Sequence, residues 1–314
     1  MPQQNNNARR ARLGRLKSAL PAQSNTFSPM SKSSRPSSSP TLGFLGAGHM
    51  AQAIAHGVID AELFSSKQII ASAPTNPNRA AFIALGCRAT ADNVEILKQA
   101  DIVVIACKPQ MFPQVAPQVA AHLRPGTLLI SIMAGLSLAQ VAQAIAPAQA
   151  TLVRAMPNTP LAVGYGVTAL CAAPDVSEKD FERAMELFAA AGTILPLDEA
   201  QMDAFTAVAG SGPAYLFYLA EAMEKSALDL GLPAAACRAM VIETLMGAVA
   251  LLTQDDDAYA DPAQLRRAVT SPRGCTAEAI RVFDEAQLPQ TVSKALAANA
   301  ARSRELRDEA AKGR

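Results

Sequence analysis

Short apolar runs alternate with longer amphipathic stretches over the first two thirds of the chain, whereas the last third has a helical pattern almost throughout. Apolar, β-branched runs bounded by turn residues predict buried strands. The predicted strands are Leu42–Leu45, Gln68–Ser72, Asp101–Cys107, Leu128–Met133, Thr151–Met156, Gly166–Cys171 and Thr193–Leu197. The helices predicted between them are Gln52–Ile59, Pro77–Leu85, Gln114–His122, Leu138–Ile145 and Glu178–Ala191. This alternation predicts an α/β fold with a parallel, doubly wound sheet over residues 41–197.

The remaining residues, 198–314, form a second predicted domain that is all helical. Its predicted helices are Met202–Val208, Pro213–Gly231, Ala234–Leu252, Pro262–Val269, Thr276–Ala286 and Leu288–Leu306. Apolar residues occupy more than one face of Tyr215–Leu230 and of Ala239–Leu252. Helices of this kind need more burial than a single subunit offers, so we expect a dimerisation domain.

A glycine-rich turn joins the first predicted strand to the first predicted helix. The turn follows the pattern G-x-G-x-x-A and consists of Gly46, Ala47, Gly48, His49, Met50 and Ala51. Gly46 permits the tight turn, Gly48 lets the backbone approach a pyrophosphate, and Ala51 lets helix and strand pack closely. The helix N-terminus then offers free N–H groups to the phosphates. The position of the motif between strand and helix predicts a Rossmann-type dinucleotide site.

Three further strands end in residues that are candidates for the same site. The strand ends are Lys108 with Pro109, Ala134 with Gly135, and the tetrapeptide at 157–160. Each is an ordinary turn when taken singly. Since ligands of open α/β sheets bind at the carboxyl ends of the strands, the three together predict one cofactor crevice.

The end of the second strand indicates which nicotinamide cofactor is bound. Enzymes that prefer NADH place an acidic residue there, to accept hydrogen bonds from the ribose hydroxyls. Residues 63–91 contain no Asp or Glu; they offer Ser72, Thr75, Asn76 and Arg79 instead. A 2′-phosphate would meet hydroxyls, an amide and a cation, so we predict NADPH, with NADH as the alternative.

Composition excludes several other functions. The chain has 28 Lys and Arg against 27 Asp and Glu, but seven of the basic residues and no acid lie in residues 1–40, so the folded body is acidic and a nucleic-acid partner is not expected. Five scattered cysteines without a C-x-x-C pair, and three histidines without metal-site spacing, predict neither disulfides nor a metal site. The apolar stretch 127–146 is interrupted by polar residues, so no membrane span is expected.

Residues 1–40 are rich in Ser, Asn, Gln, Arg and Pro, which predicts a disordered basic extension. An Arg- and Ser-rich, acid-free segment also has the composition of an organellar transit peptide. The two interpretations remain open. The expected location is the cytoplasm, or the mitochondrion if residues 1–40 are a transit peptide.

Two predicted loops interrupt the helical domain, at residues 210–213 and 270–276, each directly ahead of a helix. The second loop supplies hydroxyls and backbone N–H groups at a helix N-terminus, where a small carboxylate binds favourably. Ordinary N-capping by Ser or Thr is the alternative interpretation of both loops.

The motifs GFLGAGHMAQAI, CKPQ, MAGLSL, RAMPNTP, AGSGPAY and SPRGCTAEAI, in this order, resemble pyrroline-5-carboxylate reductases over residues 42 to 307. The first two are shared by many dinucleotide enzymes, whereas the last three together are far more specific. The resemblance implies reduction of L-1-pyrroline-5-carboxylate to L-proline with NADPH or NADH, in homodimers that assemble further into decamers. No metal is implied.

The resemblance also implies roles for individual residues. The glycine-rich turn at 46–51 would hold the pyrophosphate, and Ser72 and Asn93 would lie beside the adenosine. The residues that would line the channel for the ribose and nicotinamide are Cys107, Lys108, Pro109, Ala134 and Gly135. Those that would hold the substrate are Glu199, Ser271, Gly274, Cys275 and Thr276. The Thr276 hydroxyl would face the ring nitrogen as a proton donor.

The chain departs from the family pattern in its substrate loop. The family usually shows SPGGTT or SPGGAT, whereas here Arg273 replaces the first glycine and Cys275 stands at the variable position. If that glycine needs a positive φ, Arg273 would be strained. Alternatively, its guanidinium would add a partner for a carboxylate.

Two other functions compete with this interpretation. β-Hydroxyacid dehydrogenases also join a dinucleotide sheet to a helical domain, but they carry a catalytic lysine in a K-x-x-N-N stretch. Here Lys225 is followed by Ser-Ala-Leu-Asp, so the pattern fails. The second alternative is a non-catalytic protein that senses NADP, for which Arg273 and Cys275 are the best support.

Overall fold

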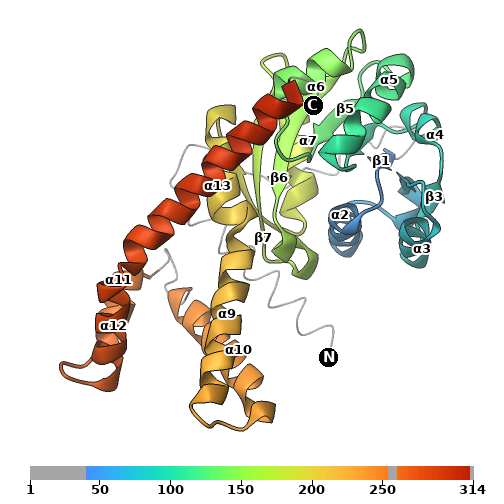
Figure 1. Cartoon of the computed structure of the whole chain (residues 1–314). Coiled ribbons are helices and arrows are strands. Elements are labelled where there is room, and N and C mark those ends of the chain that lie inside the picture. The colour runs from blue at the N-terminus through green and yellow to red at the C-terminus, as the bar shows by residue number, and fades with distance from the viewer. Residues whose placement is uncertain (1–39, 254–259, 312–314) are drawn as a thin grey trace. The chain divides into compact units, whose positions relative to one another are not determined.

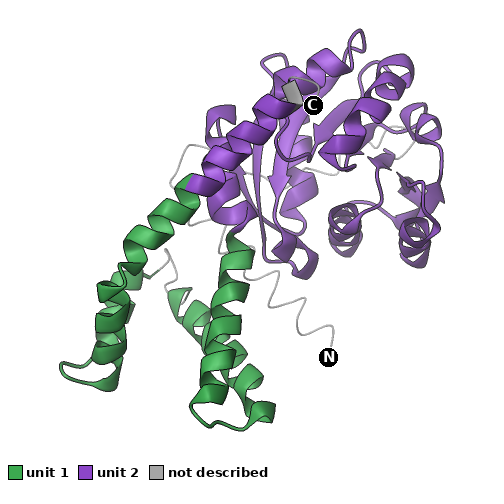
Figure 2. Cartoon of the chain, viewed as in Figure 1, with its two compact units in different colours: residues 1–27, 212–297 green, residues 28–211, 298–314 purple. Residues whose placement is uncertain are grey.

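The computed structural model describes residues 40–253 and 260–311 of the 314-residue chain. The predicted basic extension lies, apart from Pro40, outside the described residues. Clustering of contacts divides the chain into two compact units, which are coloured separately in Figure 2. The sheet unit holds residues 40–211 and 298–311, and the helical unit holds residues 212–253 and 260–297.

An eight-stranded sheet forms the sheet unit (Figure 1), in the order β3-β2-β1-β4-β5-β6-β7-β8. The strands are β1 (Leu42–Leu45), β2 (Ile69–Ser72), β3 (Arg88–Thr90), β4 (Ile102–Ile105), β5 (Leu128–Ser131), β6 (Thr151–Pro157), β7 (Gly166–Ala172) and β8 (Gly192–Pro196). All neighbouring strands are parallel except β6 and β7. The order reverses direction between β1 and β4, which is where Rossmann-type sheets bind their ligands.

Helices cover both faces of this sheet. They are α2 (His49–Asp60), α3 (Asn76–Ala84), α4 (Asn93–Leu97), α5 (Phe112–His122), α6 (Leu138–Ala144), α7 (Glu178–Ala189) and α8 (Met202–Phe205). Alternate residues of β1 enter different cores: Phe44 packs in the cluster with α2, α3 and α7, and Leu45 packs in the cluster with α4, α5 and α6. This period of two explains why the strands, buried on both faces, are continuous apolar runs.

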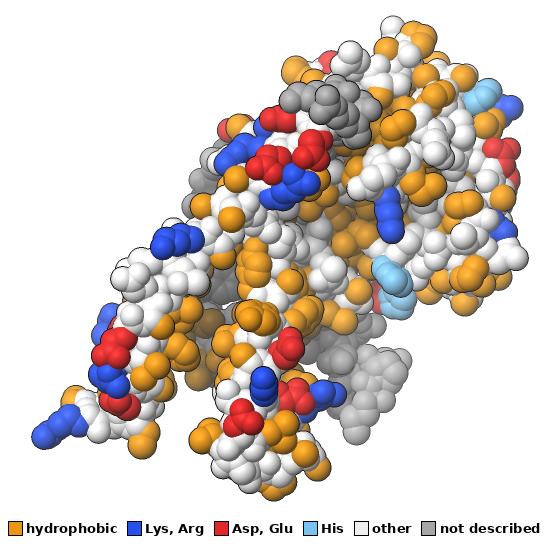
Figure 3. All heavy atoms as spheres, viewed as in Figure 1, with side chains coloured by type: hydrophobic (Ala, Val, Ile, Leu, Met, Phe, Trp, Pro, Cys, Tyr) orange, Lys and Arg blue, Asp and Glu red, His pale blue; other side chains and the backbone are white. Residues whose placement is uncertain are grey.

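The helical unit is built from α9 (Gly212–Asp229), α10 (Ala234–Leu252), α11 (Pro262–Ala268), α12 (Cys275–Glu285) and the first part of α13 (Leu288–Ala311). Many large apolar side chains on α9 and α10 are exposed, as the orange spheres of Figure 3 indicate. Within the described residues, α10 is the one helix with the length and composition of a membrane span. A helix that is covered by another subunit has the same properties.

The structure differs from the sequence-based expectations in four places. The short strand β3 and helix α4 were not predicted, since the strand has only three residues and lacks an apolar pattern. Strand β7 is antiparallel to β6, because the connection between Pro157 and Gly166 is too short for the crossover that a parallel pair needs. The helix predicted over 202–208 changes at Thr206 into a π-helix, η5 (Thr206–Gly210). The loop predicted at 210–213 is reduced to Ser211, since α9 begins at Gly212.

Candidate active site

The glycine-rich turn after β1 joins two neighbouring strand ends. Gly46 has a φ of +111°, and a Cβ there would lie 2.7 Å from the backbone of Ala106. Its N–H donates to the carbonyl oxygen of Ser72 at 3.0 Å. A residue with a side chain is therefore excluded at this position, and the turn is fixed between the ends of β2 and β4, at the reversal of strand order.

Gly48 leaves open space in front of the N-terminus of α2. A Cβ on Gly48 would have no atom within 4 Å, and its backbone is extended at φ −73°. No side chain caps α2, and no acidic residue lies in its first turn. The Gln52 side chain stabilises the turn by donating its N–H to Ala47 O at 2.9 Å. The space, the uncapped N–H groups and the dipole suit a pyrophosphate.

Ser72 and Asn93, which the resemblance assigns to the adenosine, are brought together. The Ser72 hydroxyl is buried and donates to Asn93 Oδ1 at 2.5 Å, while Asn93 Nδ2 donates to Gln118 Oε1 at 2.9 Å. Nearby, the Arg79 guanidinium of α3 donates to Ala73 O and to Asn76 Oδ1. These contacts fix a cation over the loop that follows β2.

The ends of β4 and β5 meet at two sulfur atoms. Cys107 Sγ lies 4.0 Å from Met133 Sδ, directly ahead of the predicted channel residues Ala134 and Gly135. Burial raises the pKa of the Cys107 thiol to about 11, against a weaker lowering by its backbone hydrogen bond. The thiol is therefore protonated at neutral pH and is a poor nucleophile.

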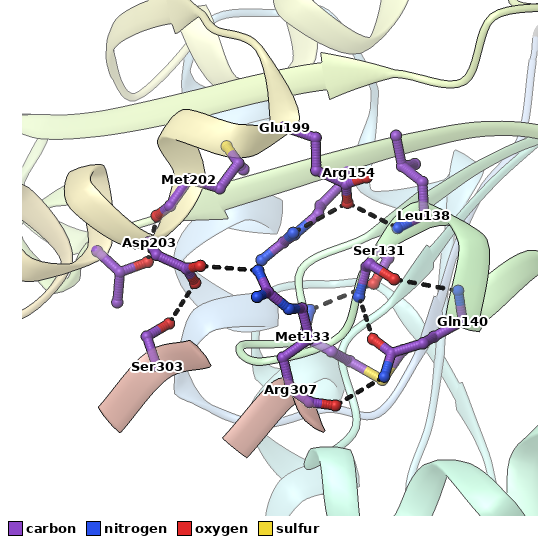
Figure 4. A network of polar contacts seen from close by, with 12 residues as sticks. Ser131, Met133, Leu138, Gln140, Arg154, Glu199, Met202, Asp203, Ser303 and Arg307 are labelled. Carbon is purple, nitrogen blue, oxygen red and sulfur yellow. Dashed lines mark hydrogen bonds and ion pairs between the residues drawn. The ribbon is translucent and has the colours of Figure 1, made fainter. Parts of the chain in front are cut away.

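Glu199, a predicted substrate ligand, has partners inside the sheet unit (Figure 4). Its Oε1 accepts from the Arg154 guanidinium at 3.0 Å and from the Leu138 N–H at 2.7 Å. The Arg154 side chain is 4% exposed and that of Glu199 is 34% exposed. The carboxylate thus neutralises a buried cation on β6 and holds the start of α6.

A second cluster of polar contacts lies beside the first in Figure 4, where the last turns of α13 pack within the sheet unit. The buried Asp203 carboxylate accepts from the Ser303 hydroxyl at 2.7 Å and from Arg307 Nη1 at 2.8 Å. Gln140 of α6 donates to the carbonyl oxygen of Arg307 at 2.7 Å. The position of a Cβ on Gly135 would lie 3.4 Å from Leu306 Cβ, so α13 also packs on the turn after β5.

The predicted substrate loop lies in the helical unit and forms a tight turn of its own. Arg273 has a φ of +60°, and a Cβ on Gly274 would lie 2.3 Å from Ser271 Oγ. The Gly274 N–H donates to Ser271 O at 3.0 Å, so this N–H is engaged within the loop. Helix α12 begins at Cys275 without a side-chain cap, and Thr276 is exposed in its first turn. The N–H groups that remain for a carboxylate are those of the helix start.

The structure thus gathers the predicted cofactor residues along one edge of the sheet unit, and the residues of the predicted substrate loop in the helical unit. Sequence reasoning missed Arg154, Asp203 and Arg307. A lone arginine in the apolar strand TLVRAMP is a signal for a buried, paired cation. Nothing in the sequence links Asp203 to a partner about a hundred positions away. Among the described residues, no group of three or more His, Cys, Asp or Glu forms a metal site.

Two family models match the chain. Residues 199–306 match the model described as pyrroline-5-carboxylate reductase dimerisation, and residues 41–135 match NADP oxidoreductase coenzyme F420-dependent. Pyrroline-5-carboxylate reductase 3 of Mus musculus is 33% identical over 84% of this chain and 95% of its own. The Pseudomonas aeruginosa pyrroline-5-carboxylate reductase is 38% identical over 87% of this chain and 98% of its own.

A solved structure extends the similarity to the fold. The Plasmodium falciparum pyrroline carboxylate reductase with NADP bound has a TM-score of 0.77 and is 28% identical, over 85% of this chain and 98% of its own. The two relatives and this structure each cover at least 84% of the chain, and so include both the dinucleotide region and the helical region. The chain therefore belongs to the pyrroline-5-carboxylate reductase family.

Proposed function

We propose that the chain reduces L-1-pyrroline-5-carboxylate to L-proline with a nicotinamide cofactor, as the reductive step of proline biosynthesis. The observation that carries the proposal is the open, uncapped start of α2 at Gly48, next to the reversal of strand order, in a chain of this family. A β-hydroxyacid dehydrogenase or a non-catalytic sensor would share this helix start, and the family of the chain is what favours the imine over them.

The residues around the strand ends fit such a cofactor. The N–H groups at the start of α2 would bind the pyrophosphate, with Gly48 leaving room for it. We propose NADPH as the preferred form, because the guanidinium of Arg79 is held over a loop without acidic residues. Thr75 makes no side-chain cap to α3, which leaves its hydroxyl for a phosphate oxygen. The bound cofactor supplies a hydride.

The substrate is a cyclic imine with a carboxylate. A protonated imine is already electrophilic, so the protein's contribution is positioning and proton supply rather than a nucleophile. The protonated state of the Cys107 thiol accords with this chemistry. The N–H groups at the start of α12 would take the substrate carboxylate, and the exposed Thr276 hydroxyl would donate to the ring nitrogen.

Homodimers are the proposed assembly, with the decamer as a further step. Support comes from the match of residues 199–306 to a dimerisation model and from the exposed apolar side chains of α9 and α10. We propose the cytoplasm as the location, with the mitochondrion as the alternative that the basic composition of residues 1–40 favours.

Purified protein mixed with NADPH and racemic pyrroline-5-carboxylate tests the function, with the loss of nicotinamide absorbance as readout. We expect turnover with the imine and, at equal cofactor concentration, faster turnover with NADPH than with NADH. A matched reaction with a β-hydroxyacid and the oxidised cofactor should show none.

Two results would reject the proposal. Turnover of the hydroxyacid without turnover of the imine would identify a dehydrogenase. Bound cofactor without turnover of either compound would identify a nucleotide sensor. Equal rates with NADPH and NADH would overturn only the proposal that Arg79 selects NADPH, and would leave the proposed reaction intact.

A further inference from the structure

The turn between β5 and α6 carries two predicted channel residues, Ala134 and Gly135, and it is held from outside its own segment. Gly135 has a φ of +72°, and its Cα faces the backbone of Leu306 and Arg307, which lies 3.7 Å from the position of a Cβ. A Cβ at this distance would be in ordinary van der Waals contact, so the turn lies beside the last turns of α13 with space for about one methyl group between them. Its position therefore depends on where the last turns of α13 lie.

The last turns of α13 are in turn fixed by side chains. Ser303 and Arg307 stand one helical turn apart on the same face of α13 and both donate to Asp203, one to each carboxylate oxygen. The Asp203 side chain is 7% exposed, so its charge depends on these donors. Arg307 also accepts from Gln140 through its carbonyl oxygen, which ties the same turn of α13 to α6.

These contacts connect the turn after β5, helix α6 and the end of α13 in a ring. From Gly135 the chain passes through Ser137 to Gln140, whose Oε1 accepts from the Ser137 N–H at 2.8 Å. Gln140 bonds to Arg307, Arg307 pairs with Asp203, and the neighbouring Leu306 packs on Gly135. Loss of the ion pair would release the segment of α13 against which the turn is packed.

We propose that Arg307 is a positioning residue for the cofactor: through Asp203 it fixes the end of α13 and thereby the turn at Ala134 and Gly135. This inference rests on the proposed function, since the resemblance to the family assigns the turn to the channel for the ribose and nicotinamide. Arg307 touches neither cofactor nor substrate in this scheme. Its substitution should therefore weaken cofactor binding and turnover while leaving the substrate loop unchanged.

Arg307→Ala in the full chain tests the proposal, and Arg302→Ala is the matched control. Arg302 lies on the same helix, its ion pairs within the part of the chain that the structure describes are with the nearby Glu305 and Glu309, and its side chain is 54% exposed. We expect Arg307→Ala to raise the cofactor Kd about tenfold in a fluorescence titration and to lower kcat, with KM for the imine within twofold. Arg307→Lys keeps one charged donor and should restore most of both losses.

Ser303→Ala provides a second, milder variant if Arg307→Ala does not fold, and it should raise the cofactor Kd about twofold to threefold. Equal cofactor affinity in Arg307→Ala and Arg302→Ala would overturn the proposal. So would a loss in Arg307→Ala that Arg307→Lys does not restore. The titration needs no imine turnover, so an inactive wild-type protein would reject the proposed function while still giving a result for Arg307.

Discussion

Arg273 is the residue at which this chain departs most clearly from the pattern of its family. Its φ of +60° lies in the left-handed region, which is the first of the two possibilities that the family's SPGGTT pattern left open for this position. For a residue that has a Cβ, this conformation costs about 1 to 2 kcal/mol. The loop of this chain therefore bears a backbone strain at Arg273.

Arg273→Gly should raise the free energy of unfolding by about 1 kcal/mol, because glycine adopts this φ without strain. Arg266→Gly, in the last turn of α11, is the control and should lower it by about 1 kcal/mol, since glycine weakens a helix. Denaturant unfolding at one fixed protein concentration measures both. A loss of stability in Arg273→Gly would mean that the guanidinium has a stabilising partner that outweighs the strain.

Glu199 has two candidate roles that one substitution separates. The resemblance assigns it to the substrate, while the structure pairs it with the buried Arg154. Glu199→Ala should lower the free energy of unfolding by about 3 kcal/mol, because it leaves a buried cation without its partner. Glu186→Ala, on the exposed side of α7, should change it by less than about 0.5 kcal/mol. Unchanged stability together with a raised KM for the imine would favour the substrate role.

At the scale of elements, the start of α2 is the part of the site on which the cofactor assignment depends. Gly48→Val should be compatible with the fold, since its Cβ meets open space and its φ suits any residue. The side chain would fill the space proposed for the pyrophosphate. We expect cofactor affinity to fall more than tenfold. The free energy of unfolding of the cofactor-free protein should change by about 1 kcal/mol or less.

Gly46→Val is the contrasting variant, because a Cβ there collides with the Ala106 backbone and the φ is positive. It should fail to fold rather than merely lose the cofactor. Both variants are measured by circular dichroism and by titration with NADPH. Full cofactor affinity in folded Gly48→Val would count against the position of the nucleotide site.

The sequence was a good guide to elements whose signal is local. The apolar runs predicted seven strands within a few residues of their observed bounds, because strands that are buried on both faces need such runs. The polar segment Arg88–Thr90 forms β3 only because β2 offers it an edge, which no local pattern reveals. The antiparallel direction of β7 likewise depends on the length of a connection rather than on composition.

The candidate site also contains features with a local sequence signal and features that depend on the tertiary fold. The turn at 46–51 was predictable and the strain at Arg273 was one of two open interpretations, since each depends on backbone geometry that a few neighbouring residues specify. The pair of Asp203 with Arg307 was not, because only the tertiary fold brings α8 and the end of α13 together. Sequence patterns thus located the proposed cofactor loop but not the contacts that hold its surroundings.

At the scale of the whole molecule, the chain combines a nucleotide sheet with a helical unit whose apolar side chains are exposed in the single chain. Leu216, Phe217 and Tyr218 of α9 are more than half exposed, and so is Met246 of α10. Exposed apolar area of this kind is typical of a subunit interface. The proposed reaction assigns the cofactor to the sheet unit and the substrate carboxylate to the helical unit of this family fold.

The most direct test of that reaction follows the hydride itself. Purified protein is incubated with racemic pyrroline-5-carboxylate and with NADPH that carries deuterium at both C4 positions of the nicotinamide. The amino acid product is then analysed by mass spectrometry. Our account predicts L-proline that carries a single deuterium at C5, the former imine carbon. Cofactor that binds to the protein but yields no deuterated proline would contradict it.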